Sequence, residues 1–436
     1  MASTYLTRTS GTATSTQKFT VSAWVKQCLN PTGATDQAIW GVGSSNTNLT
    51  YLRLRSANNS LQFYMEAGGS EISNYVTNRL FRDVSAWYHI VLAVDTTQTT
   101  AANRVKIYVN GVQETSFSSS VVPSVNHSAV YLSSNLVNIG RRPHANNNYF
   151  DGSMSHIHFI DGTAYDASAF GETDTTTGEW VGKTSPSVTY GTNGFLILKD
   201  GNTITDQSSN SNNFTLGGGT LTDLKDNPDN TFATWNPLVI TSTGGVAVRT
   251  PSFQNGITTA LFDDNGANEF ALTTFAPSKG KWYAEFKWAN ATGNGSSSVG
   301  IVKSDFVIQT DVNDQGVVYK GDGNKVVNNS GSSYGASWTT GDIIGIALDC
   351  DSNTINFYKN NAAQGSISID ADTNWYMFCS SYALSSVTRS VDANFGNGYF
   401  GTTAVASAGT NASGNGIFEY DVPTGYTALS TKGLNL

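Results

Sequence analysis

The feature that most constrains this chain is a two-residue alternation of apolar and polar side chains that recurs along its length. Phe19–Val25 and Val105–Val109 alternate in this way, as a β-strand with one face in a core must. Turn dipeptides such as Asn110-Gly111 follow these runs and supply the positive φ angles of a tight hairpin. Because no stretch keeps helical spacing of its apolar residues, we predict an all-β chain of antiparallel strands.

The length of 436 residues favours two domains over one, because a single sandwich core does not grow this large. Two polar runs, Asp206–Asn213 and Asp226–Thr231, interrupt the alternation. We predict two antiparallel β-sandwich (jelly-roll) domains in tandem plus a short C-terminal flap that packs on the second domain. The predicted ranges are 1–220 and 221–400 for the domains, about 217–240 for the linker, and 401–436 for the flap.

The surface is expected to be polar but weakly charged. Charged residues make up 13% of the chain, about half of the roughly 25% typical of soluble domains, and the net charge is -9. Basic residues are scattered, with Arg141-Arg142 as the densest pair, so we exclude nucleic acid as a partner. No segment reaches the roughly 18 apolar residues of a membrane span, and the N-terminus lacks the profile of a secretory signal.

The three cysteines, Cys28, Cys350 and Cys379, are far apart and show no Cys-x-x-Cys spacing. We predict that all three are buried, reduced side chains. A single bridge between Cys350 and Cys379 is the alternative.

A series of segments in the first half resembles the laminin-G/concanavalin-like jelly-roll superfamily. The segments are Phe19–Val25, Trp87–Val91, Ile107–Gly111, Asn138–Gly140 and Phe150–Gly152. The resemblance implies a jelly roll with one hairpin closed by Asn-Gly and a closing strand entered through Asp-Gly.

Five segments in the second half look like a SPRY domain, in that family's order. They are Gly280–Phe286, Val299–Ile301, Gly341–Asp349, Ile355–Asn360 and Val391–Gly396. The resemblance implies a bent antiparallel sandwich that binds partners through loops at one end and does no catalysis.

The whole arrangement, with its opening at Tyr5–Thr9 and the phrase Asn230–Leu238, resembles structural proteins of tailed bacteriophages, particularly marine ones. The resemblance implies a protein of the virion surface that assembles in the host cytoplasm without a signal peptide. It implies contacts with other virion proteins or with host cell-surface glycan. It also implies a homo-oligomer, and by analogy with fibre components we expect a trimer. Tail fibre, receptor-binding component and capsid decoration stay open. The alternatives are a soluble glycan-binding lectin and a polysaccharide depolymerase on a concanavalin-like fold.

The enzymatic alternative requires paired carboxylates. One glycosidase signature of the superfamily is E-x-D-x-x-E, which places its acids on one face of a strand. The nearest phrase starts at Glu172 and Asp174 but has Thr177 at the second Glu position, in a segment that we expect to be a loop. We therefore predict no enzyme and no catalytic residue.

His156 and His158 are spaced i, i+2 on one strand. With Ile157 and Phe159 turned to the core, we expect both imidazoles to face solvent or the partner sheet and not to hold a metal.

Calcium is the only cofactor that we consider, because laminin-G-like domains often bind it at the rim of the sandwich. Asp95, Asp151 and Asp161 begin or follow predicted strands and are the candidate ligands. Asp-Gly is also ordinary turn chemistry.

Glycan binding needs an aromatic face surrounded by amides or carboxylates. The segment His144–Phe150 and the loop Asn324–Trp338 of the second domain offer these groups. The candidate ligand-binding residues are Trp40, His144, Asn147, Asn148, Tyr149 and Tyr334.

Overall fold

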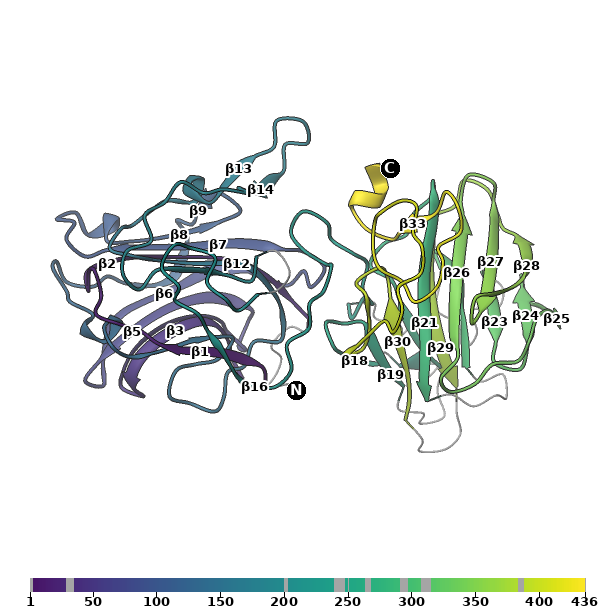
Figure 1. Cartoon of the computed structure of the whole chain (residues 1–436), viewed down its shortest axis with the longest axis horizontal. Helices are drawn as coiled ribbons and strands as arrows, with labels where there is room; N and C mark the ends of the chain where they lie inside the picture. Colours follow the sequence, from purple (N-terminus) through teal and green to yellow (C-terminus); the bar gives the residue numbers. More distant parts are fainter. Residues whose placement is uncertain are drawn as a thin grey trace. The chain divides into compact units, whose positions relative to one another are not determined.

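The computed structural model describes residues 3–28, 35–199, 203–238, 248–249, 251–262, 268–290, 297–306, 315–382 and 388–435. It confirms the all-β prediction: within these ranges the elements are strands, apart from short 3-10 turns. The chain divides into two compact units, Met1–Asp223 and Leu224–Leu436, which are shown in Figure 1 and described separately below. In the described ranges no helix has the length and hydrophobicity of a membrane span.

Unit 1 is a sandwich of an eight-stranded and a six-stranded sheet. The eight-stranded sheet has the order β10-β6-β5-β4-β3-β11-β1-β16. Its strands are β1 (Tyr5–Thr9), β3 (Gln37–Ser45), β4 (Asn48–Leu54), β5 (Ser60–Ala67), β6 (Ser70–Leu80), β10 (Phe117–Val121), β11 (Leu136–Ile139) and β16 (Thr215–Gly218).

The six-stranded sheet of unit 1 has the order β15-β12-β2-β7-β8-β9. Its strands are β2 (Lys18–Gln27), β7 (Tyr88–Asp95), β8 (Val105–Val109), β9 (Val112–Gln113), β12 (Gly152–Asp161) and β15 (Phe195–Ile197). The remaining elements are a two-stranded hairpin and 3-10 turns: β13 (Gly171–Thr173), β14 (Trp180–Gly182), η1 (Ala101–Asn103), η2 (Val130–Leu132) and η3 (Ala167–Ala169).

The alternation seen in the sequence sets the faces of these strands. In β2, Phe19 lies opposite Val94 and Val21 opposite Leu92 of β7. All four side chains enter one buried apolar cluster between the two sheets. The residues between them face the other side of the six-stranded sheet, since successive side chains of a strand alternate.

Unit 2 also contains two main sheets. The seven-stranded sheet has the order β17-β20-β29-β22-β23-β24-β25, and the other main sheet follows β18-β19-β30-β21-β26-β27-β28, with β33 beside β21. The strands of the first are β17 (Val248–Arg249), β20 (Asn268–Leu272), β22 (Ser297–Lys303), β23 (Gly316–Lys320), β24 (Asn324–Val327), β25 (Ser330–Ser333) and β29 (Trp375–Tyr382).

The second main sheet and the remaining elements of unit 2 complete the structure. They are β18 (Ser252–Gln254), β19 (Thr259–Phe262), β21 (Lys281–Asn290), β26 (Ile343–Asp349), β27 (Thr354–Lys359), β28 (Ala362–Ser368), β30 (Arg389–Asn394), β31 (Tyr399–Phe400), β32 (Thr403–Ala404), β33 (Thr427–Ala428) and η4 (Lys432–Asn435). The last described residues, 401–435, belong to unit 2, where β33 pairs in parallel with β21.

The three cysteines all lie in the described part of the chain, are buried and form no disulfide. The predicted reduced state is therefore observed, and the alternative bridge between Cys350 and Cys379 is not formed.

Candidate functional site

The loop predicted to bind glycan lies between β11 and β12 of unit 1. It folds back on the eight-stranded sheet, where the Pro143 ring packs against Gly41 so closely that a Cβ there would lie 2.7 Å from Pro143 Cδ. His144 Nε2 lies 2.6 Å from the Gly43 carbonyl oxygen. This part of the loop is thus fastened by its own contacts, although His144 is exposed at the surface.

The other predicted residues of this loop differ in their exposure. Asn147 is exposed, Tyr149 is half-buried and Asn148 is buried. Asn148 adopts φ 57°, and its carbonyl accepts a hydrogen bond from Ala38 N at 2.9 Å. The Tyr149 ring lies 6.1 Å from that of Tyr5. Asn148 therefore shapes the loop, whereas Asn147 and one side of Tyr149 are available for contact.

Trp40 was predicted as a stacking platform, and this prediction is wrong. Its side chain is only 1% exposed and lies in the core, with ring centroids 5.8 Å from Phe19 and 5.4 Å from Phe159. The neighbouring outward positions on β3 are Gly41 and Gly43, so the large side chain takes the inward phase of the strand.

Tyr334, the candidate in unit 2, follows β25 and is half-buried. Its hydroxyl donates to the Gly365 carbonyl oxygen, and its ring packs edge-on against Tyr319 at 5.3 Å. Lys325 Nζ lies 5.1 Å from the ring centroid. These internal contacts leave only part of one ring face for a partner.

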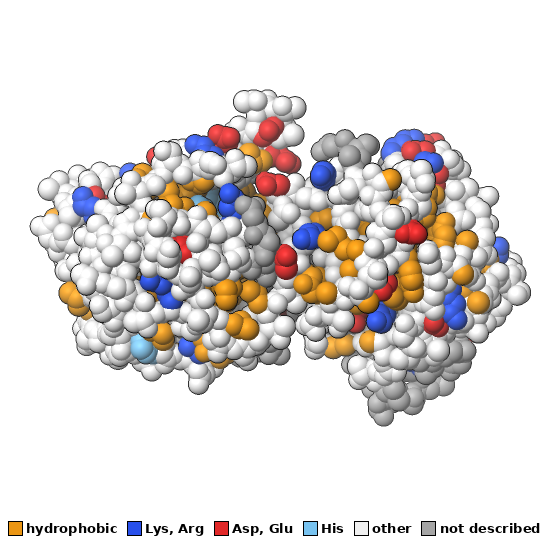
Figure 2. All heavy atoms as spheres, in the orientation of Figure 1, with side chains coloured by type: hydrophobic (Ala, Val, Ile, Leu, Met, Phe, Trp, Pro, Cys, Tyr) orange, Lys and Arg blue, Asp and Glu red, His pale blue; other side chains and the backbone are white. Residues whose placement is uncertain are grey.

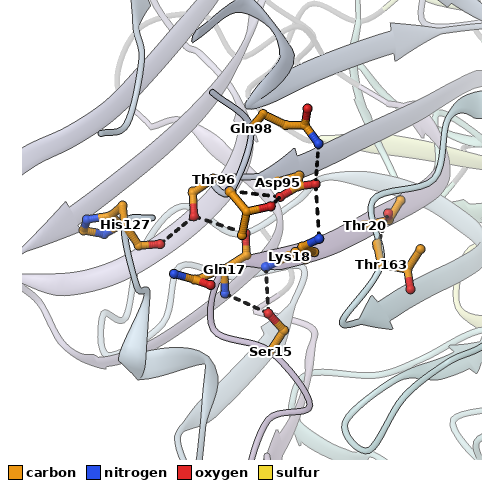
Figure 3. A network of polar contacts seen from close by, with 10 residues as sticks. Ser15, Gln17, Lys18, Thr20, Asp95, Thr96, Gln98, His127 and Thr163 are labelled. Carbon is orange, nitrogen blue, oxygen red and sulfur yellow. Dashed lines mark hydrogen bonds and ion pairs between the residues drawn. The ribbon is translucent and has the colours of Figure 1, made fainter. Parts of the chain in front are cut away.

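Asp95, one of the predicted calcium ligands, belongs to a polar network shown in Figure 3. Its carboxylate accepts hydrogen bonds from Thr97 N at 3.0 Å and Gln98 Nε2 at 2.8 Å. Lys18 Nζ completes the contacts with an ion pair of 3.5 Å. A cation of the protein thus occupies the place that a bound ion would take.

Asp161 is also saturated by the protein itself. Its carboxylate, in a residue only 3% exposed, accepts hydrogen bonds from Thr14 N at 2.7 Å, Ser15 N at 3.1 Å and Asn193 N at 3.0 Å. Each donor is a backbone amide, so this carboxylate fixes two loops instead of holding a metal.

The three predicted calcium ligands do not form one site. Asp151 precedes the first residue of β12 and Asp161 is its last, which separates them by about 30 Å in an extended strand. Among the described residues no group of three or more His, Cys, Asp or Glu side chains is placed to hold a metal ion.

The histidine pair on β12 differs from the prediction as well. Ile157 and Phe159 enter the core as expected, but His158 is only 2% exposed. It contacts Phe170 at 5.1 Å and Tyr190 at 6.1 Å between centroids. A segment that follows β12 covers this face of the sheet, so His158 meets neither solvent nor the partner sheet.

The structure shows a hollow in unit 1 that sequence reasoning missed. It has a volume of about 570 Å³. The lining residues are Thr14, Val188, Thr189, Tyr190, Gly191, Thr192, Ser209 and Asn210. Among the described residues, no charged side chain lines it. Hydroxyl groups, one amide and one aromatic ring are the groups that it offers to a ligand.

Side-chain hydrogen bonds hold the three segments of this hollow together. Thr192 N donates to Thr14 Oγ1 at 2.8 Å. Asn210 Nδ2 donates to the carbonyl oxygens of Gly191 at 2.5 Å and Gly194 at 2.9 Å. The segments are therefore fixed before any ligand arrives, and a preorganised site loses less entropy on binding.

A buried carboxylate organises the third of these segments. Asp206 accepts hydrogen bonds from Leu196 N, Ser208 N and Asn212 N, at 2.9, 2.8 and 2.8 Å. The polar run Asp206–Asn213, which interrupts the alternation in the sequence, is a loop of unit 1. Its composition alone does not show that Asp206 accepts a hydrogen bond from Leu196 of β15.

Two family models match parts of the chain. Residues 1–169 match the model described as the concanavalin A-like lectin/glucanases superfamily, and residues 281–397 match the SPRY domain model. The chain therefore carries a laminin-G-like and a SPRY-like domain in tandem. Domains of these two kinds indicate binding of carbohydrate or protein, of an adhesion type. A comparison with curated proteins gives no match.

The solved structures that match include three of low sequence identity. The SPRY domain of human HERC1 is 21% identical over 33% of this chain and 96% of its own, with a TM-score of 0.27. Domains LG4-5 of the mouse laminin alpha1 chain are 11% identical over 86% and 78%, with a TM-score of 0.29. Stonustoxin is 15% identical over 37% of this chain, which spans 27% of the stonustoxin chain, with a TM-score of 0.29.

Proposed function

We propose that this chain is a non-enzymatic adhesion protein that binds an uncharged glycan in the hollow of its laminin-G-like domain. The observation that carries the proposal is the lining, whose residues include hydroxyl-bearing side chains, the amide residue Asn210 and the aromatic residue Tyr190. Sugars are recognised by such a combination of an aromatic face and neutral hydrogen-bonding groups. An anionic or cationic ligand would find no opposite charge among the described lining residues.

The absence of catalysis is part of the same proposal. Hydrolysis of a glycosidic bond needs two carboxyl groups at the reacting bond. The two acids of the phrase that most resembles the glycosidase signature do not line the hollow. Glu172 is exposed on β13. The Asp174 carboxylate accepts hydrogen bonds from Thr176 N and Thr177 N at 2.9 and 2.7 Å. This arrangement supports a turn-forming role for the phrase, and we propose no active site.

A glycan array of the full chain tests the proposal. We expect binding of one or more uncharged glycans, and we expect Ser209→Trp, which fills the hollow, to abolish it. Ser70→Trp places the same indole at an exposed position, the first residue of β6 in the same domain, and serves as the control. If no uncharged glycan binds, or if both variants bind as well as the wild type, the hollow is not the ligand site.

We propose further that the protein is displayed on the surface of a tailed-phage virion, as a tail fibre, receptor-binding or capsid decoration component. Its partners there would be other virion proteins and host cell-surface glycan, and its assembly a homo-oligomer, with a trimer as the first expectation. The sequence of domains and the sparse charge support this proposal. Figure 2 shows charged side chains scattered among many uncharged ones on the displayed face of each unit.

Antibody labelling of purified particles, together with the mass of the native assembly, tests the virion role. Labelled particles would support it. Absence of the chain from particles would end the virion role but not glycan binding, and a soluble lectin would then be the better assignment.

A further inference from the structure

The six-stranded sheet of the laminin-G-like domain has an outer face that is covered by one segment of the chain. We call residues Gly162–Gly194 the cover segment; it contains η3, β13 and β14, and Figure 1 shows its β13–β14 hairpin projecting from the sheet. Ala167 and Phe170 of this segment pack on Val91 and Ile160 of the sheet. Backbone hydrogen bonds of Thr163 and Tyr165 with Thr20 Oγ1 of β2 add to this contact, and two histidines of the sheet also bind the cover segment.

His89 of β7 is the first of these histidines, and its side chain is 1% exposed. Trp24 stacks on the imidazole with centroids 4.8 Å apart. Trp180 Nε1 donates a hydrogen bond to His89 Nδ1 at 2.9 Å, and Nε2 lies 2.9 Å from Ser22 Oγ. An indole N–H can only donate, so Nδ1 must be unprotonated. The geometry therefore requires a neutral His89 whose Nε2–H donates to Ser22.

The indole of Trp180 has a close-fitting place on the sheet. A Cβ at Gly111 would lie 2.5 Å from Trp180 Cε3, and one at Gly171 would lie 2.5 Å from Cζ2. Only glycine leaves room for the ring at both positions. The hydrogen bond to His89 is therefore the fixed polar contact between the β13–β14 hairpin and the sheet.

His158 of β12 is the second histidine. Its Nδ1 lies 3.0 Å from the hydroxyl of Tyr190, and Tyr190 lines the ligand hollow. The cover segment also contributes Val188, Thr189, Gly191 and Thr192 to that lining. The two imidazoles thus hold the segment that forms one wall of the hollow.

The charges around the two imidazoles disfavour a proton on either of them. Burial lowers the pKa of His89 to about 3, with the charge of His156 as a further cause. Burial also places the pKa of His158 well below its usual value, and His156, His89 and Lys199 add to this. Within the described part of the chain, no carboxylate is among the groups whose charge acts on either imidazole.

We propose that the cover segment is an acid-released wall of the ligand hollow, which His89 and His158 hold in place only while both are neutral. A proton on His89 Nδ1 removes the acceptor that Trp180 requires, and a proton on His158 leaves a buried cation against Tyr190 and Phe170. Opening the cover segment hydrates both imidazoles. The proposal rests on the proposed function in that it makes ligand binding in the hollow dependent on pH.

Hydrogen exchange of the full chain, read by mass spectrometry without any ligand, tests the proposal. Protection factors corrected for the intrinsic exchange rate are compared at pH 7 and pH 4 for peptides of the cover segment. Tyr165 N, which donates to Thr20 Oγ1 of β2 at 2.8 Å, reports on its closure. We expect protection to fall by about 100-fold at pH 4, which follows from linkage for one imidazole with the lowered pKa. Peptides from β4 and β5 should keep their protection.

Two substitutions separate the role of the imidazoles from general acid sensitivity. His89→Gln and His158→Gln keep an acceptor and a donor but do not titrate, so the double variant should retain protection of the cover segment at pH 4. His127→Gln, a histidine of the same domain outside the cover segment, should behave like the wild type. The proposal would be overturned if protection of the cover segment in the wild type did not fall at pH 4, or if it fell equally in the double variant. It would also be overturned if β4 and β5 lost protection at the same time. None of these outcomes bears on whether the hollow binds glycan at pH 7.

Discussion

Each domain carries a peripheral segment on one of its sheets, and the two segments are anchored by opposite chemistry. In the laminin-G-like domain, the neutral imidazoles of His89 and His158 receive the cover segment. In the SPRY-like domain, the carboxyl group of Glu285 accepts hydrogen bonds from Glu419 N at 2.8 Å and Tyr420 N at 2.9 Å. The comparison teaches that burial makes the charge of an anchoring side chain costly, so that both kinds of anchor should lose stability when the side chain becomes charged.

The carboxyl group of Glu285 is the more enclosed of these anchors, in a side chain that is 0% exposed. Tyr283 donates its hydroxyl to it at 3.2 Å, and Asn394 Nδ2 lies 3.4 Å away. Asn394 Nδ2 also donates to the Ile417 carbonyl oxygen at 3.0 Å. One acidic side chain thus joins β21, β30 and the C-terminal segment, and burial raises its pKa to about 7.

The largest effect is expected for Glu285→Ala. It leaves the amides of Glu419 and Tyr420 buried without an acceptor, and each such group costs roughly 1–3 kcal/mol. We expect the free energy of unfolding of the SPRY-like domain to fall by about 3 kcal/mol, as measured by urea denaturation. Glu172→Ala, at an exposed position of the other domain, should change it little. A loss below about 1 kcal/mol would mean that Glu285 is no anchor.

The two domains should respond to pH in opposite directions. The pKa of His89, lowered to about 3, gives stability that is complete above about pH 6.5 and is lost as the pH falls toward that pKa, by about 1.4 kcal/mol per pH unit. The lowered pKa of His158 acts in the same direction. The raised pKa of Glu285 gives stability that is complete below its ordinary value of 4.5 and is lost as the pH rises through 7, about 3 kcal/mol in all.

Urea denaturation between pH 4 and 8, followed by hydrogen exchange of peptides from each domain, measures these trends. Subtracting the trend of the His89→Gln/His158→Gln variant, or of Glu285→Gln, isolates the contribution of each anchor. Contributions with the same sign in both domains would contradict the comparison.

A smaller effect is expected inside the cover segment, where Gly171 of β13 leaves room for the Trp180 indole of β14. Gly171→Ala pushes a methyl group into Trp180, and such overpacking costs about 1–3 kcal/mol. Gly331→Ala is the control, since the nearest atom to its Cβ would be 4.0 Å away. Combined with Trp180→Ala, the cost of Gly171→Ala should nearly vanish, because the clash needs the indole. Additive costs in the double variant would place the clash elsewhere.

The smallest effects on the free energy of unfolding are expected for two ion pairs. Comparing them tests whether burial or charge determines how much such a contact stabilises the domain. Lys281 Nζ lies 2.9 Å from Asp349, whose side chain is mostly buried, whereas the pair of Lys279 with Asp372 spans 3.6 Å and is exposed on both sides. We expect Lys281→Ala to cost up to about 1 kcal/mol and Lys279→Ala about 0.2 kcal/mol or less. Thermal denaturation of both variants measures this difference, and equal losses would argue against burial as the deciding factor.

The local sequence pattern predicted the strands well, but it did not predict which other parts of the chain pack against them. The alternation of Phe19–Val25 gave the inward face of β2 correctly, and Ile157 and Phe159 of β12 enter the core as expected. The same pattern placed His158 on the outward face but could not show that a later segment covers that face. Trp40 was misjudged because an aromatic side chain suits a ligand platform and a core equally well, and only the packing of the second sheet separates them.

The sequence by itself determined the all-β architecture and the two family resemblances, since alternation and turn dipeptides act over a few neighbouring residues. Tertiary structure alone decided the order of the strands in each sheet, which outward side chains are buried and where the hollow forms. The hollow joins Thr14, Tyr190 and Asn210, and the anchor at Glu285 joins β21 to residues near the C-terminus. Such sites depend on contacts between segments far apart in the chain, and no periodicity within one segment encodes them.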